Sequence, residues 1–234
     1  MAATLARAAV PVVHQLLTLV LAAALAAVPA PALAQAAIPA VPPAAVTPEQ
    51  DARPPLAGRA LVTALRGGGY VLYLRHTSTD FGENDERMTD YADCKNQRNL
   101  TDAGRAEARD IGAALRELQI PIGEVLASPF CRTMETGRLV FGRATVSLAV
   151  RGGPARPETP DRYADLRRLL STPVAGRTNT AIASHGNPFF GVTGGPYLAE
   201  GEIAVIDPQG NGKFRIVARI PKNGWTALIA AMRG

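Results

Sequence analysis

The sequence lacks the motifs that identify several common classes of enzyme. No Gly-x-Gly-x-x-Gly motif follows an expected strand, and no glycine-rich phosphate loop ends in lysine. These absences argue against a dinucleotide-binding or P-loop nucleotide-binding protein. The Gly-x-Ser-x-Gly turn that carries the nucleophile of many serine hydrolases is also missing. No internal repeat is visible.

The chain has no run of basic residues, although its formal net charge is +5. Its 25 lysines and arginines are scattered along the chain, so a nucleic-acid or lipid-binding patch is not expected. The positive balance suits an anionic substrate, and it equally suits an ordinary solvated surface. With 47% hydrophobic and 19% charged residues, the 234-residue chain has the composition of one substantial globular domain.

The first 34 residues have the pattern of a secretory signal peptide. Arg7 precedes an apolar run over residues 16–28, which is too short to span a bilayer well. Ala32 and Ala34 then form an Ala-x-Ala cleavage site. We expect a signal peptide over 1–34, cleaved after Ala34, the alternative being an uncleaved anchor. The protein is thus expected to be exported, periplasmic or secreted, with no stable membrane span after cleavage.

Residues 35–55 are rich in alanine and proline and show no helical or strand period, which predicts a flexible tether. The folded domain is expected over 56–234. In an exported chain, an even pair of cysteines predicts a disulfide between Cys94 and Cys131. Two unrelated buried thiols are the alternative.

Short apolar runs alternate with amphipathic segments along the domain. We expect strands over 70–74, 123–127, 145–150, 180–183, 203–206 and 214–220. We expect helices over 56–66, 102–118, 132–141, 161–170 and 225–232. Thr101 is the expected N-cap of the second helix. This alternation predicts an α/β fold, a three-layer sandwich with a mostly parallel central sheet.

Histidines and arginines follow the ends of these strands. Arg75 and His76 follow the first strand, Arg132 comes soon after the second, and His185 comes just after the strand near 180–183. Functional side chains gather at the carboxyl ends of parallel strands, so we expect these four to meet. A single histidine at a strand end is more simply a core or rim residue, but two histidines accompanied by arginines are a less ordinary coincidence.

The chemistry of phosphoryl transfer explains this combination of residues. Catalysis of that reaction is mainly positioning and stabilisation of charge on the phosphoryl oxygens, and arginine offers a planar fork that matches those oxygens. A neutral imidazole is a nucleophile able to form a covalent intermediate. Two histidines without a third ligand make a poor zinc site, and neither cysteine has the arginine six residues on that a cysteine-dependent phosphatase requires. We expect no metal and no cofactor.

Four motifs together resemble the histidine phosphatase superfamily, which includes phosphoglycerate mutases, acid phosphatases and phytases. Residues 75–77 (RHT) resemble its first histidine signature, and 128–136 (SPFCRTMET) its Ser-Pro-x-x-Arg-x-x-x-Thr segment. Residues 100–104 (LTDAG) are similar to the Leu-Thr-x-x-Gly that opens its first long helix, and 184–187 (SHGN) to its second histidine motif. The resemblance covers about residue 70 to the C-terminus and implies a phosphoglycerate mutase-like fold of branch 1.

The resemblance also implies roles for individual residues. His76 would be the nucleophile that is transiently phosphorylated, and Arg75, Arg132 and His185 would bind the phosphoryl group. Thr79 stands where the family often places a hydroxyl on the phosphate side.

The acid that protonates the leaving group departs from the family pattern. Some members place an Asp just after the second histidine, but here Gly186 and Asn187 follow His185. Other members place a Glu after the second arginine, and Glu158 matches that arrangement. Glu202, at the start of an expected strand, is the preferred candidate.

The function implied is metal-independent hydrolysis of a phosphomonoester through a phosphohistidine intermediate. The substrate is expected to be small or envelope-associated, a small-molecule or glycan phosphomonoester, with no nucleic acid as partner. The alternatives are a non-catalytic phosphate-binding or interaction module on the same fold, or a phosphomutase. Export favours hydrolysis, since mutase action on sugar phosphates belongs to cytosolic metabolism.

Overall fold

A computed structural model of the protein describes residues 54–151 and 161–234. The expected signal peptide over 1–34 and nearly all of the expected tether over 35–55 lie outside the described residues. Glu158 lies outside them too. The expectations for these segments therefore stay predictions.

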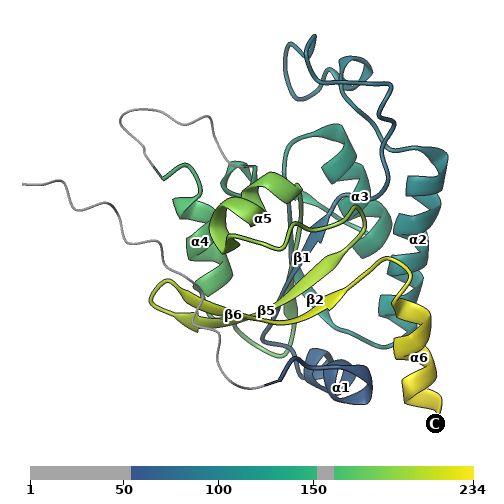
Figure 1. Cartoon of the computed structure of the whole chain (residues 1–234), viewed down its shortest axis with the longest axis vertical. Helices are drawn as coiled ribbons and strands as arrows, with labels where there is room; N and C mark the ends of the chain where they lie inside the picture. The colour runs from purple at the N-terminus through teal and green to yellow at the C-terminus, as the bar shows by residue number, and fades with distance from the viewer. Residues whose placement is uncertain (1–53, 152–160) are drawn as a thin grey trace, which may run out of the picture. The chain divides into compact units, whose positions relative to one another are not determined.

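Within the described residues, six strands form one sheet in the order β3-β2-β4-β1-β5-β6. Figure 1 labels β1, β2, β5 and β6. The strands are β1 Val71–Arg75, β2 Ile122–Ala127, β3 Thr145–Val146, β4 Asn179–Ser184, β5 Ile203–Gly210 and β6 Lys213–Ile220. β1 to β4 pair in parallel, whereas β5 and β6 add two antiparallel strands at one edge. The mostly parallel α/β sheet expected from the sequence is confirmed.

Helices cover both faces of this sheet. They are α1 Gly58–Gly67, α2 Asp102–Glu117, α3 Cys131–Phe141, α4 Ala164–Ser171, α5 Gly186–Thr193 and α6 Trp225–Arg233, with short 3-10 turns η1 Cys94–Asn96 and η2 Leu148–Val150. α5 was not expected from the sequence. Its Gly-Asn-Pro start reads as a loop, yet proline is tolerated in the first turn of a helix because its missing N–H has no intrahelical partner there.

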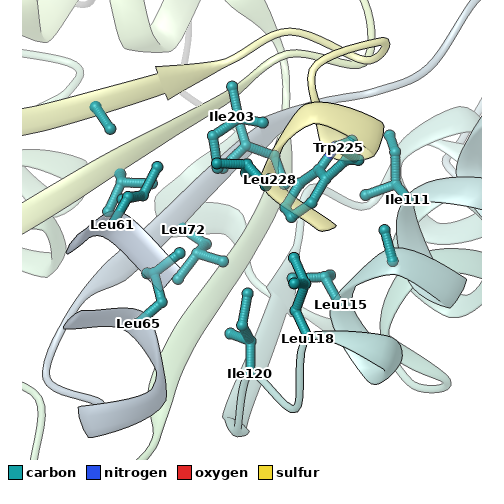
Figure 2. Close-up of a cluster of buried hydrophobic side chains, with 14 of the residues drawn as sticks. Leu61, Leu65, Leu72, Ile111, Leu115, Leu118, Ile120, Ile203, Trp225 and Leu228 are labelled. Carbon is teal, nitrogen blue, oxygen red and sulfur yellow. The ribbon is translucent and has the colours of Figure 1, made fainter. Parts of the chain in front are cut away.

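The alternating side chains of β1 show why that strand is apolar throughout. Leu72 and Leu74 pack on one face of the sheet with α1, α2 and α6, and this cluster includes Trp225 of α6 (Figure 2). Val71 and Tyr73 pack on the other face with α4 and α5. A strand that is covered on both faces needs apolar residues at every position. The two clusters thus make the three layers expected from the sequence.

The start of α2 explains the Leu-Thr-x-x-Gly motif. The hydroxyl of Thr101 accepts a hydrogen bond from the Gly104 N–H at 2.9 Å, which caps the helix as expected. A Cβ on Gly104 would lie 2.0 Å from the carbonyl oxygen of Ser78. Glycine at this position therefore lets the helix approach the segment that follows His76.

No described helix is long and apolar enough to cross a membrane.

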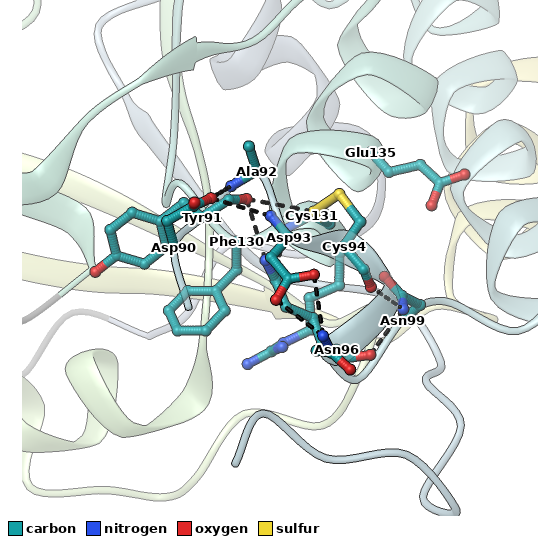
Figure 3. Close-up of a disulfide and its surroundings, with 12 residues drawn as sticks. Asp90, Tyr91, Ala92, Asp93, Cys94, Asn96, Asn99, Phe130, Cys131 and Glu135 are labelled. Carbon is teal, nitrogen blue, oxygen red and sulfur yellow. Dashed lines mark hydrogen bonds between the residues drawn. A yellow bond between two sulfur atoms is a disulfide. The ribbon is translucent and has the colours of Figure 1, made fainter. Parts of the chain in front are cut away.

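The expected disulfide between Cys94 and Cys131 is present, with Cα atoms 5.7 Å apart (Figure 3). It joins the loop before α2 to the first residue of α3. Gln97 reinforces the link, because its Oε1 accepts from the Cys131 N–H at 2.9 Å. The ring of Tyr91, from the same loop, packs edge-on against Phe130 with centroids 5.3 Å apart. The loop is therefore held against α3 at several points.

Breaking this disulfide should destabilise the fold. The bridge closes a loop across 37 residues, so in the chain-entropy model its loss lowers the free energy of unfolding by about 3–4 kcal/mol. Urea unfolding of the Cys94→Ser, Cys131→Ser double variant measures this against the oxidised wild type. Equal unfolding midpoints for the two proteins would show that the disulfide contributes nothing to stability.

Candidate functional site

Three neighbouring strands end at one edge of the sheet and bring the expected residues together. β4 lies between β1 and β2. Beyond the strand ends, the His76 N–H donates to the Ser184 carbonyl at 2.9 Å, and the Ser128 N–H donates to the Ala183 carbonyl at 3.0 Å. These bonds extend the sheet pairing by one residue on each side of β4. They place the first motif, the second motif and the second histidine side by side.

A cavity of about 390 Å³ opens at this edge. Its lining comes from all three strand ends and from the segments that follow them: Arg75, His76, Arg98, Phe130, Arg132, Arg151, Arg162, Tyr163, His185, Gly186, Asn187, Pro188 and Tyr197. Arg75, His76, Arg132 and His185 were expected to meet, and all four line this cavity. Thr79 and Glu202, also expected at the site, are not among the lining residues.

His76 is held as a neutral imidazole with a defined tautomer. Its Nδ1 lies 3.0 Å from the Thr77 carbonyl oxygen, which can only accept, so Nδ1 carries the proton and Nε2 keeps its lone pair. The side chain is almost fully buried, with 1% of the residue exposed. Burial, together with the charges of Arg132 and Arg75, lowers the pKa of His76 to about 3.

His185 stands across from His76, with the two ring centroids 5.6 Å apart. Its Nε2 lies 2.8 Å from the Ser128 hydroxyl, and the Tyr73 hydroxyl donates to its backbone carbonyl at 2.8 Å. Burial and the nearby Arg132 charge hold the pKa of His185 well below its usual value. This contact explains why the second motif begins with a serine, because the Ser128 hydroxyl positions the second histidine.

The Arg75 guanidinium is fixed by two acceptors. Nη1 donates to the Leu198 carbonyl at 2.8 Å, and Nη2 donates to Glu200 Oε1 at 3.3 Å. The same Glu200 oxygen lies 3.9 Å from His76 Nδ1. Glu200 thus sets the position of Arg75 beside the nucleophile candidate.

The Arg132 guanidinium forms a two-pronged pair with Asp85. Nη1 and Nη2 donate to the two carboxylate oxygens at 2.9 and 3.0 Å. Burial raises the pKa of Asp85, but the hydrogen bonds from Arg132 and from the Arg98 backbone outweigh it and lower that pKa below its usual value. Asp85 is therefore an ionised carboxylate beside the cavity.

The expectation that Glu202 serves as the acid is not supported by its surroundings. Its carboxylate accepts from Arg219 Nε at 2.6 Å and from Nη2 at 2.9 Å, and from the Ala199 N–H at 2.8 Å. Although burial opposes the effect, these bonds lower the pKa of Glu202. A carboxylate that accepts three hydrogen bonds and stays ionised is a poor proton donor. These contacts disfavour Glu202 as the acid, and its assignment stays a prediction.

Thr79 does not present its hydroxyl to the cavity either. Its Oγ1 and its backbone N–H donate to the two oxygens of Glu200, at 2.8 and 3.2 Å. Thr79 therefore holds Glu200, which in turn holds Arg75. Its contribution to a phosphate site is indirect, contrary to the expectation.

Sequence reasoning missed three arginines of the cavity wall. Arg98 belongs to the Gln-Arg-Asn stretch before α2, whereas Arg151 and Arg162 stand at the two ends of the segment outside the described residues. None of the three directly follows a strand of the structure. β3 ends at Val146, so Arg151 comes after the turn η2 and not after the expected strand over 145–150. Among the described residues, no cluster of three His, Cys, Asp or Glu side chains is arranged to hold a metal ion.

The depressed pKa of His76 has a measurable consequence. With the folded pKa at about 3 and the unfolded value near 6.5, the imidazole should show no titration between pH 5 and 8 when its ring proton is followed by NMR. Because the unfolded chain binds more protons between about pH 3 and 6.5, the free energy of unfolding should fall as the pH drops through this window. A titration midpoint near 6.5 in the native protein would contradict the buried neutral state.

One part of the chain matches a known protein family. Residues 71–153 match the family model described as histidine phosphatase superfamily (branch 1). That segment contains Arg75, His76 and Arg132. No curated protein matches the sequence significantly.

Several solved structures are similar to the described domain. The protein histidine phosphatase SixA, complexed with tungstate, is 21% identical with a TM-score of 0.45, and the alignment covers 65% of this chain and 97% of SixA. Mycobacterial hydrolase 1 is 12% identical with a TM-score of 0.46, and the alignment covers 64% of this chain and 98% of the hydrolase. A mycobacterial glucosyl-3-phosphoglycerate phosphatase is 13% identical with a TM-score of 0.41, and the alignment covers 63% of this chain and 96% of the phosphatase.

Proposed function

We propose that this chain, whose residues 71–153 match the family model of the histidine phosphatase superfamily (branch 1), is a metal-independent phosphomonoester hydrolase whose nucleophile is His76. The observation that carries the proposal is the state of His76 itself. Its Nδ1 is bound to the Thr77 carbonyl at 3.0 Å, and burial keeps the ring neutral, so Nε2 has a free lone pair beside guanidinium groups. This combination suits nucleophilic attack on phosphorus.

In the first step, Nε2 of His76 forms a bond to phosphorus while the ester P–O bond breaks. The electron pair of that bond leaves with the oxygen, which takes up a proton to give the alcohol product. Negative charge on the three remaining phosphoryl oxygens is balanced by Arg75 and Arg132, with His185 beside them. α5 begins at Gly186, which lines the cavity, and the N–H groups at the start of a helix favour an anion.

In the second step, water attacks the phosphorus of phosphohistidine and the P–N bond breaks. The electron pair returns to Nε2 of His76, the water gives a proton to the group that protonated the leaving oxygen in the first step, and inorganic phosphate leaves. The chain thus ends each cycle with its original neutral imidazole. Two easier displacements replace one difficult hydrolysis.

Glu202, which Arg219 holds in its ionised state, is disfavoured as the donor of the proton to the leaving oxygen. Glu158 was the other carboxylate expected from the sequence, and it lies outside the described residues. Its role as the acid stays a prediction, with a bound water as the alternative donor.

The substrate we propose is a small or envelope-associated phosphomonoester. Tyr163 and Tyr197 line the cavity, where Tyr163 contacts Arg162 and Tyr197 contacts Arg75. Aromatic side chains next to a cation suit a ring-bearing alcohol with polar substituents. We also propose that the protein is exported, with which the disulfide between Cys94 and Cys131 is compatible.

Purified mature protein should hydrolyse p-nitrophenyl phosphate, and vanadate should inhibit the reaction strongly because it imitates the transferring phosphoryl group. EDTA should leave the rate unchanged. A panel of phosphomonoesters then ranks the possible alcohols by kcat/KM. Tight vanadate binding with no turnover of any ester would favour a non-catalytic phosphate-binding module, and loss of activity with EDTA that zinc restores would contradict the metal-free mechanism.

A further inference from the structure

Three arginines of the cavity wall each bury a donor that lacks an acceptor. The Nε–H groups of Arg75, Arg98 and Arg132 are shielded from solvent and find no hydrogen-bond partner in the described part of the chain. A buried donor without an acceptor costs free energy. Three such donors around one cavity indicate that an anion with several oxygens is the intended partner. Two of the three belong to the expected phosphate-binding set, whereas Arg98 does not.

The backbone of Arg98 is fixed directly beside Arg132. Its carbonyl accepts from Arg132 Nη1 at 3.1 Å, and its N–H donates to Asp85 Oδ1 at 2.9 Å. The preceding residue, Gln97, binds the start of α3 through the Cys131 N–H at 2.9 Å. Arg98 is therefore tied to the same helix start as Arg132 and does not stand on a free loop.

The charges around the cavity are unevenly paired. Glu200 lies on Arg75 at 3.3 Å, and Asp85 lies on Arg132 at 2.9 Å. The guanidinium of Arg98 forms no ion pair with a carboxylate of residues 54–151 or 161–234. Its charge nevertheless acts on the centre of the site, because it is among the charges that lower the pKa values of both His76 and His185.

Phe81 gives Arg98 a second constraint. The Arg98 guanidinium carbon lies 5.0 Å from the Phe81 ring centroid, and Phe81 is 74% exposed. A phenylalanine this exposed gains little from burial. Its contact with Arg98 is a cation–π interaction, which favours this position of the guanidinium beside the cavity.

We propose that Arg98 is a third phosphoryl-binding arginine of this site and that Phe81 positions it. The assignment rests on the proposed function, since it takes the anion in the cavity to be the phosphoryl group of a substrate. Arg98 supplies a positive charge that forms no ion pair with a described carboxylate, and it stands beside Arg132 with an Nε–H that lacks an acceptor. The phosphoryl oxygens would accept from Arg75, Arg98 and Arg132 together.

Equilibrium binding of tungstate, measured by calorimetry, tests the assignment without requiring turnover. Arg98→Gln should raise the Kd of tungstate by at least about tenfold, the loss expected for one hydrogen bond between charged groups. Arg98→Lys should fall between Gln and the wild type, because it keeps the charge but loses the planar fork. Phe81→Leu should raise the Kd by about two- to fivefold. Arg109→Gln, which removes an exposed arginine of α2 that does not line the cavity, is the matched control and should leave the Kd unchanged.

The outcomes separate this assignment from the proposed function. Wild-type affinity in Arg98→Gln would overturn the role of Arg98 while leaving the hydrolase proposal in place. Weaker tungstate binding in Arg98→Gln, with no ester turned over by the wild type, would support the anion site and overturn the hydrolase. No binding of tungstate by the wild type would contradict both. If Arg98→Gln does not fold, by circular dichroism, Arg98→Lys and Phe81→Leu carry the test, and wild-type affinity in both would overturn the assignment.

Discussion

His76→Ala is expected to reduce the turnover of p-nitrophenyl phosphate to background. In the proposed mechanism every molecule of ester passes through a bond between Nε2 of His76 and phosphorus, so removal of the imidazole removes the pathway itself. We expect a fall in kcat of at least about a thousandfold, the scale seen when a covalent nucleophile is deleted. Steady-state kinetics on the purified variant measure it.

The control for this variant concerns folding. His76 is buried and its Nδ1–H satisfies the Thr77 carbonyl, so alanine leaves a small cavity and an unpaired acceptor, at a cost of about 1–3 kcal/mol. His76→Asn fills part of the space and keeps a donor, and it should be equally inactive. Thermal melting shows whether each variant is folded. A folded His76→Ala protein with undiminished kcat would remove His76 from the mechanism.

Arg132→Ala is expected to lower kcat by about a hundredfold or more. Its guanidinium lies on the cavity wall with an unpartnered Nε–H, and it supplies charge that matters most when the phosphoryl group is transferring. A transition-state role predicts that kcat and kcat/KM fall together. A rise in KM alone would mean that Arg132 only binds the ground state.

Arg132 also has a structural role, which the experiment must separate from its role in catalysis. Its pair with Asp85 joins α3 to the loop before α2, and removing one partner leaves the Asp85 carboxylate without its counter-charge. Arg132→Lys keeps a positive charge near Asp85 but loses the fork, so it should retain the melting temperature better than Arg132→Ala while staying slow. If Arg132→Lys has wild-type kcat, the planar fork is not needed for catalysis.

The part of the site carried by strand ends could be predicted from the sequence. Val71 to Leu74 are apolar at every position because β1 is covered on both faces, and such a run is recognisable without a structure. Residues that follow parallel strands must meet at one edge, which is why Arg75, His76 and His185 were expected together. Thr101 at the start of α2 was predictable for a local reason, since a cap acts within its own helix turn.

The carboxylates could not be assigned in the same way. Glu200 and Glu202 are two residues apart, and a strand would place both side chains on one face. Gly201 instead adopts a φ of 77° in a turn before β5 begins at Ile203, so the two side chains diverge. Glu200 binds Arg75 and Thr79, whereas Glu202 binds Arg219, which lies on β6.

Arg98 and Asp85 escaped prediction because their neighbours are set by long-range connections. Asp85 lies 47 residues before the arginine it binds. The disulfide was expected, but it did not reveal which loop residues would lie at the cavity. That depends on the path of the loop between Asp80 and Asn99. That path depends on side-chain contacts such as Tyr91 on Phe130, which have no local sequence signal.

The most direct test of the account is to trap the covalent intermediate. Wild-type protein mixed with an excess of p-nitrophenyl phosphate, quenched within milliseconds in alkali and digested, should yield a phosphorylated peptide with the modification on His76, stable to alkali and labile to acid as a P–N bond requires. The amount should rise in step with the burst of p-nitrophenol, and His76→Asn should give none. A burst of product with no phosphoryl group on His76, or with one on His185 instead, would contradict the assignment of His76 as the nucleophile.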